Sequence, residues 1–199
     1  PLTIDVQGIS IDGLPTKIVL SRGQVDSTSY ALDQMLFDPL YAPKEISWHV
    51  DATDAVDVHI DPVTRHLVVV APADRSLWEQ LTLRAVNPDG QTASAVIDLF
   101  VNAGPVLTAV AEPLDFAEDS VLRLSLDDLA EDPDAPDAQL SWTVSAPAVL
   151  GARIEGPPHE LILEPQANWH GNSLVTLTAM DRFGFTDSTS LNVNVTSVN

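Results

Sequence analysis

The stretches "LTLRAVNPDG" (residues 81–90) and "VTLTAMDRFG" (residues 175–184) decide the fold, because they are two copies of one pattern. In each copy apolar residues alternate with other residues, and the run ends in a turn that closes on glycine. Alternation with a period of two is typical of a β-strand that buries one face. The pattern therefore predicts the same strand and turn twice, 94 residues apart.

This spacing holds without a gap over most of a domain, which makes the chain an internal repeat. The other matched stretches are "YALDQMLFDP" (30–39) with "LSLDDLAEDP" (124–133), "ISWHV" (46–50) with "LSWTV" (140–144), and "HLVVVAPAD" (66–74) with "ELILEPQAN" (160–168). Trp48 and Trp142 fall on the same mid-strand position. We expect both tryptophans in the cores.

The second copy predicts seven short strands in about 95 residues. They are expected near 106–110, 120–126, 139–145, 152–155, 160–164, 173–180 and 187–196, with a helical turn at "LDDLA" (126–130). That number of strands predicts an all-β fold of two tandem seven-stranded Greek-key β-sandwiches. We expect the first sandwich at 10–103 and the second at 104–199.

Residues 1–9 are expected to be the terminal strand of a preceding repeat, or its linker. The reason is that "LTIDV" (2–6) resembles the terminal strands "IDLFV" (97–101) and "LNVNV" (191–195). We expect this segment either to pack as an edge strand or to fray. The chain then reads as a window cut from a longer array.

The composition excludes several classes of function. A formal net charge of −20 argues against nucleic acid and against an anionic membrane surface as partners. No apolar run approaches the roughly 18 residues that a membrane span needs, so no membrane insertion is expected. The absence of cysteine excludes disulfides and thiolate metal sites.

The region "VHIDPVTRHLVVVAPADRSLWEQLTLRAVNPDG" (58–90) resembles the second half of a cadherin repeat. The second copy, with "FAEDSVLRLSL", "EDPD" and "VTLTAMDRFG", is similar to the bacterial cadherin-like repeats, which occur as tandem arrays in secreted and surface-anchored proteins. The resemblance covers nearly the whole chain from about residue 10. It implies calcium bound where one sandwich meets the next, since calcium accepts oxygens from several loops.

The resemblance also implies a set of calcium ligands. They are Asp132, Asp134 and Asp181 from the second copy with Asp74 and Asn102 from the first. The pattern is incomplete, because Ser76 and Gln24 stand where glutamates are expected and the linker lacks its aspartates. We therefore expect at most one weakly bound ion. From residues alone, "EDPDAPD" (131–137) is better explained as a solvated acidic turn, and it is the resemblance that makes calcium an equal alternative.

Two further groups of residues suggest other chemistry. Trp78 and Trp169 are expected in the loop before the sixth strand, where exposed rings could stack on a sugar. The pairs His49 with Asp51 and His59 with Asp61 share strand faces and could in principle orient a metal or activate a serine. No serine elbow, HExxH helix or glycine-rich phosphate loop accompanies them. We expect surface pairs and no enzyme activity.

The function expected from the sequence is structural and adhesive, in repeat modules of a bacterial extracellular or cell-surface protein. The alternative is a carbohydrate- or protein-binding accessory region of a secreted enzyme, and a further one is an acidic spacer adapted to salt. The expected partners are neighbouring repeats of the same chain and a surface protein or glycan. We expect a monomer.

Overall fold

The computed structural model describes residues 8–51, 55–110, 113–134 and 139–198. The chain divides into two compact units, Pro1–Asn102 (the first unit) and Ala103–Asn199 (the second unit). In both units the described residues form β-strands joined by turns and short 3-10 helices, with no α-helix among them. The all-β prediction is confirmed. No helix in these four ranges is long and apolar enough to cross a membrane.

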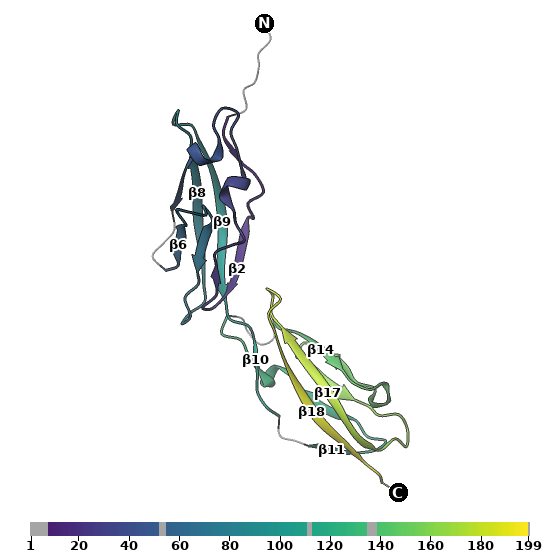
Figure 1. Ribbon diagram of the computed structural model, residues 1–199. Coiled ribbons are helices and arrows are strands. Elements are labelled where there is room, and N and C mark those ends of the chain that lie inside the picture. Colours follow the sequence, from purple (N-terminus) through teal and green to yellow (C-terminus); the bar gives the residue numbers. More distant parts are fainter. Residues whose placement is uncertain (1–7, 52–54, 111–112, 135–138, 199) are drawn as a thin grey trace. The chain divides into compact units, whose positions relative to one another are not determined.

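The first unit contains a four-stranded, a three-stranded and a two-stranded sheet, with strand orders β2-β9-β8-β5, β3-β7-β6 and β1-β4. Its strands are β1 (Ser10–Ile11), β2 (Lys17–Ser21), β3 (Val25–Asp26), β4 (Leu36–Phe37), β5 (Ser47–Asp51), β6 (Asp57–Ile60), β7 (Leu67–Val70), β8 (Leu77–Val86) and β9 (Thr92–Asn102). Its 3-10 helices are Leu32–Gln34 and Pro43–Glu45. The long hairpin of β8 and β9 runs along the unit (Figure 1).

The second unit repeats this arrangement, with sheets β11-β18-β17-β14, β12-β16-β15 and β10-β13. Its strands are β10 (Val106–Leu107), β11 (Leu114–Ala117), β12 (Leu122–Ser125), β13 (Ala130–Glu131), β14 (Ser141–Ser145), β15 (Arg153–Glu155), β16 (Glu160–Leu163), β17 (Gly171–Met180) and β18 (Thr186–Thr196). The 3-10 helices that lie wholly within its described residues are Asp127–Leu129 and Ala148–Leu150. The first of these is the helical turn expected from "LDDLA".

The core of each unit lies between its four-stranded and three-stranded sheets. In the 81–85 part of β8 and the 175–179 part of β17 every second residue is buried, for example Leu83 and Leu177, which stand at matched positions of the repeat. The opposite faces of these strands carry mostly polar side chains. Trp48 and Trp142 are partly buried and pack against the two cores, as their mid-strand positions predict. Alternation therefore places the core correctly in both copies.

The first edge of the second sandwich differs from the sequence prediction. One strand was expected at 106–110, but the structure has two short strands, β10 and β11, which join different sheets. β10 pairs antiparallel with β13, whereas β11 pairs in parallel with β18. Pro113 immediately precedes β11, and proline has no N–H to continue a ladder. The edge strand therefore breaks and changes sheet. The expected terminal strand at 2–6 lies outside the described residues.

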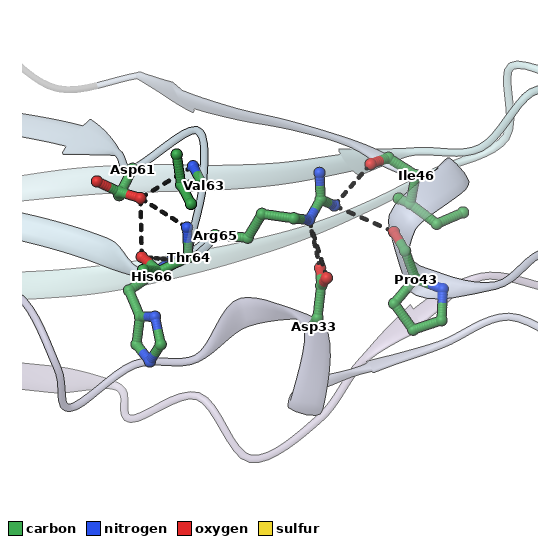
Figure 2. Close-up of polar contacts among 8 residues, drawn as sticks. All are labelled: Asp33, Pro43, Ile46, Asp61, Val63, Thr64, Arg65 and His66. Atoms are coloured by element: carbon green, nitrogen blue, oxygen red, sulfur yellow. Dashed lines mark hydrogen bonds and ion pairs between the residues drawn. The ribbon is translucent and has the colours of Figure 1, made fainter.

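Arg65 anchors the first unit's connection between β4 and β5 (Figure 2). Its Nε donates to both carboxylate oxygens of Asp33, at 2.8 and 2.9 Å. Its Nη2 donates to the carbonyl oxygens of Pro43 and Ile46, at 3.1 and 2.8 Å. One guanidinium thus satisfies a carboxylate from the first 3-10 helix and two carbonyls from the second. Asp61 stabilises the turn that precedes Arg65, because its Oδ1 accepts hydrogen bonds from the backbone N–H groups of Val63 and Thr64.

Candidate functional site

The turn after β4 in the first unit holds an aspartate and an asparagine in direct contact. Asp38 Oδ1 accepts from the backbone N–H of Leu40 at 2.8 Å and of Tyr41 at 3.0 Å. Its Oδ2 accepts from the side-chain amide of Asn87, at 3.0 Å. Loss of hydration would raise the pKa of Asp38, but the hydrogen bonds from Asn87, Leu40 and Tyr41 together lower it. An amide donor therefore stabilises this carboxylate without any ion.

The second unit has the same turn with a different charge. Asp132 Oδ1 accepts from the backbone N–H of Asp134 at 2.8 Å, as Asp38 accepts from Leu40. Asp181 occupies the position of Asn87, and its Oδ1 accepts from the backbone N–H of Phe185 at 2.9 Å. Asp181 is buried, with 5% of its surface exposed. The second unit therefore has a buried carboxylate at the position where the first unit has an amide donor.

This exchange has a chemical consequence at the second unit's turn. The amide of Asn87 supplies a proton to its neighbouring aspartate, whereas a carboxylate at the same place supplies none. Two carboxylates at neighbouring positions repel each other unless a proton or a cation lies between them. Asp134 is partly engaged already, because its Oδ2 accepts from the backbone N–H of Ala103. The turn has the oxygen donors that calcium prefers.

The predicted ligands in the first unit have different surroundings. Asp74 is exposed and lies 3.8 Å from the guanidinium of Arg75. Asn102 is buried at the end of β9, and its carbonyl oxygen accepts from the N–H of Arg22 at 3.1 Å. Across the described ranges, no group of three or more His, Asp or Glu side chains is arranged to hold a metal ion. The predicted set is thus spread over both units.

The strand register corrects one assignment made from the ungapped repeat. Gln24 was expected to match Glu118, but Arg22 stands at that place in the fold. Arg22 N–H donates to the carbonyl of Asn102, and Glu118 N–H donates to the carbonyl of Thr196, which is the repeat of Asn102. β2 is therefore displaced by two residues relative to β11. The Gln24 side chain instead accepts from the backbone of Ser21, within its own turn.

The two units consequently carry opposite charges at this matched position. In the first unit the guanidinium of Arg22 donates to the hydroxyl of Ser76, at 2.9 Å. In the second unit the buried carboxylate of Glu118 lies 3.3 Å from the Nδ1 of His170, which is the repeat of Ser76. A fixed guanidinium lowers the attraction of nearby carboxylates for a cation. The sequence missed this residue because a gap-free alignment cannot show a shift in one edge strand.

Glu118 holds the segment that follows β18. It accepts from the backbone N–H of Val198 at 3.0 Å and from the hydroxyl of Ser197 at 3.3 Å. The hydrogen bond from Val198 is the main reason that the pKa of Glu118 lies below its ordinary value, and the contacts with His170 and Ser197 lower it further. The carboxylate is therefore a structural clamp between β11 and the end of β18.

The histidine and tryptophan predictions are resolved residue by residue. His49 and Asp51 are exposed on β5, while His59 contacts Asp57 at 3.1 Å rather than Asp61. These positions are surface positions, as expected. Trp78 lies within β8 and not in a loop, and 59% of its surface is exposed. Trp169 lies in the loop before β17, as predicted, but it is partly buried and packs against the second core, so its ring is not an exposed stacking surface.

Solved structures of tandem sandwich domains resemble this chain. Domains 3–5 of Drosophila OTK match with a TM-score of 0.54 and 12% identity, over 96% of this chain and 62% of that chain. Sidekick-1 immunoglobulin domains 1–4 match with a TM-score of 0.52 and 15% identity, over 96% and 48%. The chain is a tandem of immunoglobulin-like or cadherin-like β-sandwich domains. These sandwiches span less than two thirds of the length of either matched structure.

The human desmocollin-1 ectodomain, a further match, has a TM-score of 0.37 and 13% identity, over 96% of this chain and 41% of that one. Comparison by sequence finds no protein family and no curated protein that matches these tandem sandwiches.

Proposed function

We propose that these tandem sandwiches are non-catalytic structural and adhesive modules of a bacterial extracellular or cell-surface protein. The observation that carries the proposal is what the two copies keep in common. Both keep the alternating core of the long hairpin and the Asp-capped turn after β4 or β13, while their polar surfaces diverge. Modules that serve as spacers and attachment points require a shared fold and no shared reactive site.

The similarity to extracellular domains supports the same proposal. The matched OTK segment is described as extracellular domains, and its fold is shared over nearly the whole of this chain. A net charge of −20 with no cysteine suits a soluble module in salty surroundings. The proposed partners are neighbouring repeats of the same chain and a surface protein or glycan, with the chain itself monomeric.

The adhesive role is tested by attaching the purified chain to beads and measuring their retention on bacterial and host-cell surfaces under flow. Retention above that of beads carrying an unrelated acidic protein supports an adhesive module. Equal retention of both bead types contradicts adhesion and leaves a spacer. Cleavage of a peptide, ester or glycoside substrate by the chain would contradict the non-catalytic assignment.

We further propose weak calcium binding by Asp132, Asp134 and Asp181, with Asp74 and Asn102 as the ligands contributed by the first unit. Support comes from the replacement of Asn87 by Asp181 at a buried turn position. The guanidinium of Arg22 and the lost glutamates argue for low affinity, with a Kd on the order of 10⁻⁴–10⁻³ M. At that affinity, about 10 mM calcium stabilises the folded chain by roughly 1.5–3 kcal/mol.

Melting curves in calcium and in magnesium at equal ionic strength test the calcium proposal. We expect a rise specific to calcium that is lost in Asp134→Asn, which removes a charge but keeps an acceptor for the Ala103 N–H. Asp115→Asn is the matched control, because Asp115 is an exposed residue on β11. Equal shifts with both ions, or a calcium effect that survives Asp134→Asn, would exclude this site.

The alternative function is a carbohydrate- or protein-binding accessory region of a secreted enzyme. One observation favours it, namely the exposed ring of Trp78 on the outer face of the first unit.

A further inference from the structure

Trp78 stands beside Phe100 on the outward face of the first unit's four-stranded sheet. The two residues are directly opposite each other in the register of β8 and β9, and their ring centroids are 6.5 Å apart at an interplanar angle of 43°. Val19 of β2 is opposite Phe100 on the other side. Together, Trp78, Phe100 and Val19 form a short apolar row across three strands, which we call the aromatic row.

The aromatic row does not contribute to the core. On β8 the inward positions Leu81, Leu83 and Ala85 are fully buried, whereas Trp78 lies on the opposite face with 59% of its surface exposed. A large exposed ring of this kind often marks a site of interaction, and the exposed part of Trp78 is available to a ligand.

The second unit shows that the fold does not require aromatic residues here. Asn172 and Asn194 occupy the positions in the second unit that are equivalent to Trp78 and Phe100. They are opposite each other in the register of β17 and β18. Both pairs occupy the same outward positions of the same hairpin, so the sandwich forms with either chemistry. The aromatic pair is therefore a feature of the first unit's surface.

Polar side chains border the aromatic row one step along each strand. Gln80 follows Trp78 on the outward face of β8, and its Nε2 donates to Asp98 Oδ1 at 3.1 Å. Lys17 of β2 is opposite Asp98 in the register. An amide, a carboxylate and an ammonium thus lie next to a ring. Apolar contact combined with a few placed polar groups is typical of a small-ligand site.

We propose that Trp78 and Phe100 form a stacking site for a neutral, gluco-configured glycan, with Gln80 and Asp98 as its hydrogen-bonding edge. A pyranose with equatorial hydroxyls presents a face of C–H groups to a ring and its hydroxyls to the sides. The row consists of three apolar side chains bordered by polar residues, whereas a stable protein partner covers about 20–30 residues on each side, so a small ligand fits the row better. The net charge of −20 disfavours an anionic glycan.

The test is a fluorescence and calorimetric titration of the full chain with cellohexaose, an N-acetylglucosamine hexamer and an alginate hexamer. We expect binding of cellohexaose or of the N-acetylglucosamine hexamer, with the preferred one identifying the sugar class, and no binding of alginate. The emission change is assigned to Trp78 by subtracting the Trp78→Phe variant, because the chain has four tryptophans. Trp78→Ala is expected to weaken affinity about tenfold or more through lost ring contact.

Two variants test whether the binding depends on the aromatic row rather than on any exposed apolar side chain. Leu174→Ala removes an equally exposed apolar side chain from β17 of the second unit, and its affinity should equal that of the parent. Trp78→Ala should melt at the parent's temperature, since the ring is outside the core. Absence of binding to both neutral hexamers, or equal affinity of Trp78→Ala and the parent, overturns the proposal. Tighter binding of alginate than of the neutral sugars also overturns it. None of these results bears on the structural role or on calcium.

Discussion

Arg65 and His159 stand at matched positions of the repeat and anchor equivalent loops with different side chains. Arg65 binds Asp33, and His159 Nδ1 lies 2.7 Å from Asp127, which is the repeat of Asp33. The backbone N–H of His159 also donates to Asp127, at 3.1 Å. The first unit adds two carbonyl acceptors to its cation, at Pro43 and Ile46. Arg65 therefore connects the loop before β5 to the turn that contains Asp33, in addition to the hydrogen bonds that Asp38 makes within this loop.

Replacing Arg65 with alanine should destabilise the first unit by about 1–3 kcal/mol, because one substitution removes charge-assisted bonds to Asp33 and donors to two carbonyls. Chemical denaturation of the full chain, followed at the first unit's amides by hydrogen exchange, measures this loss. The control is Arg153→Ala, whose ion pairs with Glu155 and Glu164 are on the exposed surface and are worth about 0–1 kcal/mol. Equal effects of the two variants would contradict the anchoring role.

Glu118 should make the second unit acid-sensitive. Its folded pKa lies below the ordinary value of 4.5, mainly because the Val198 N–H donates to it. A lowered folded pKa stabilises the fold fully above the unfolded pKa, and that contribution disappears as the pH falls through the folded pKa. Glu118→Gln should therefore lower the melting temperature of the second unit at pH 7. Between pH 7 and pH 3 the melting temperature of this variant should fall less than that of the parent. A variant with the parent's pH profile would contradict this role.

At the scale of elements, the sequence predicts the long hairpins well and the edges poorly. Strands at 173–180 and 187–196 were expected, and β17 and β18 cover both ranges in full, beginning at Gly171 and Thr186. Their alternation is strong because one face is fully buried. β11 was missed and β2 was misaligned by two residues, because a parallel edge strand is placed by hydrogen bonds to its neighbour rather than by an apolar period.

The matched core positions Leu83 and Leu177 test whether the two hairpins carry equal weight in their units. Both side chains are fully buried, so Leu83→Ala and Leu177→Ala should each destabilise the unit that contains it by about 2–5 kcal/mol. Val96→Ala, which truncates an exposed side chain on β9, is the control and should change stability by less than about 0.5 kcal/mol. Hydrogen exchange of individual backbone amides shows which unit each substitution destabilises. A large loss in the control would show that the outward face also contributes to the packing.

At the scale of the whole molecule, the calcium site stays a prediction. Asp132, Asp134 and Asp181 could be named only through the resemblance to cadherin repeats. What the sequence could not show was the neutral version of that turn, in which Asn87 donates to Asp38. The charge of Arg22 at the place of Glu118 was equally hidden, since it follows from strand register. Side-chain contacts of this kind depend on tertiary pairing.

The excess of 29 acidic over 9 basic residues should make the stability of the chain depend on salt of any kind. Exposed carboxylates repel one another over the Debye length, which falls from about 30 Å at 0.01 M to about 8 Å at 0.15 M ionic strength. Sodium chloride should therefore raise the melting temperature over this range, and the rise should level off as screening becomes complete. Magnesium chloride at equal ionic strength sets the baseline for the calcium series, so only the excess seen with calcium reports a bound ion. A melting temperature that falls with sodium chloride would contradict the prediction, because attractive pairs such as Arg65 with Asp33 would then outweigh the general repulsion.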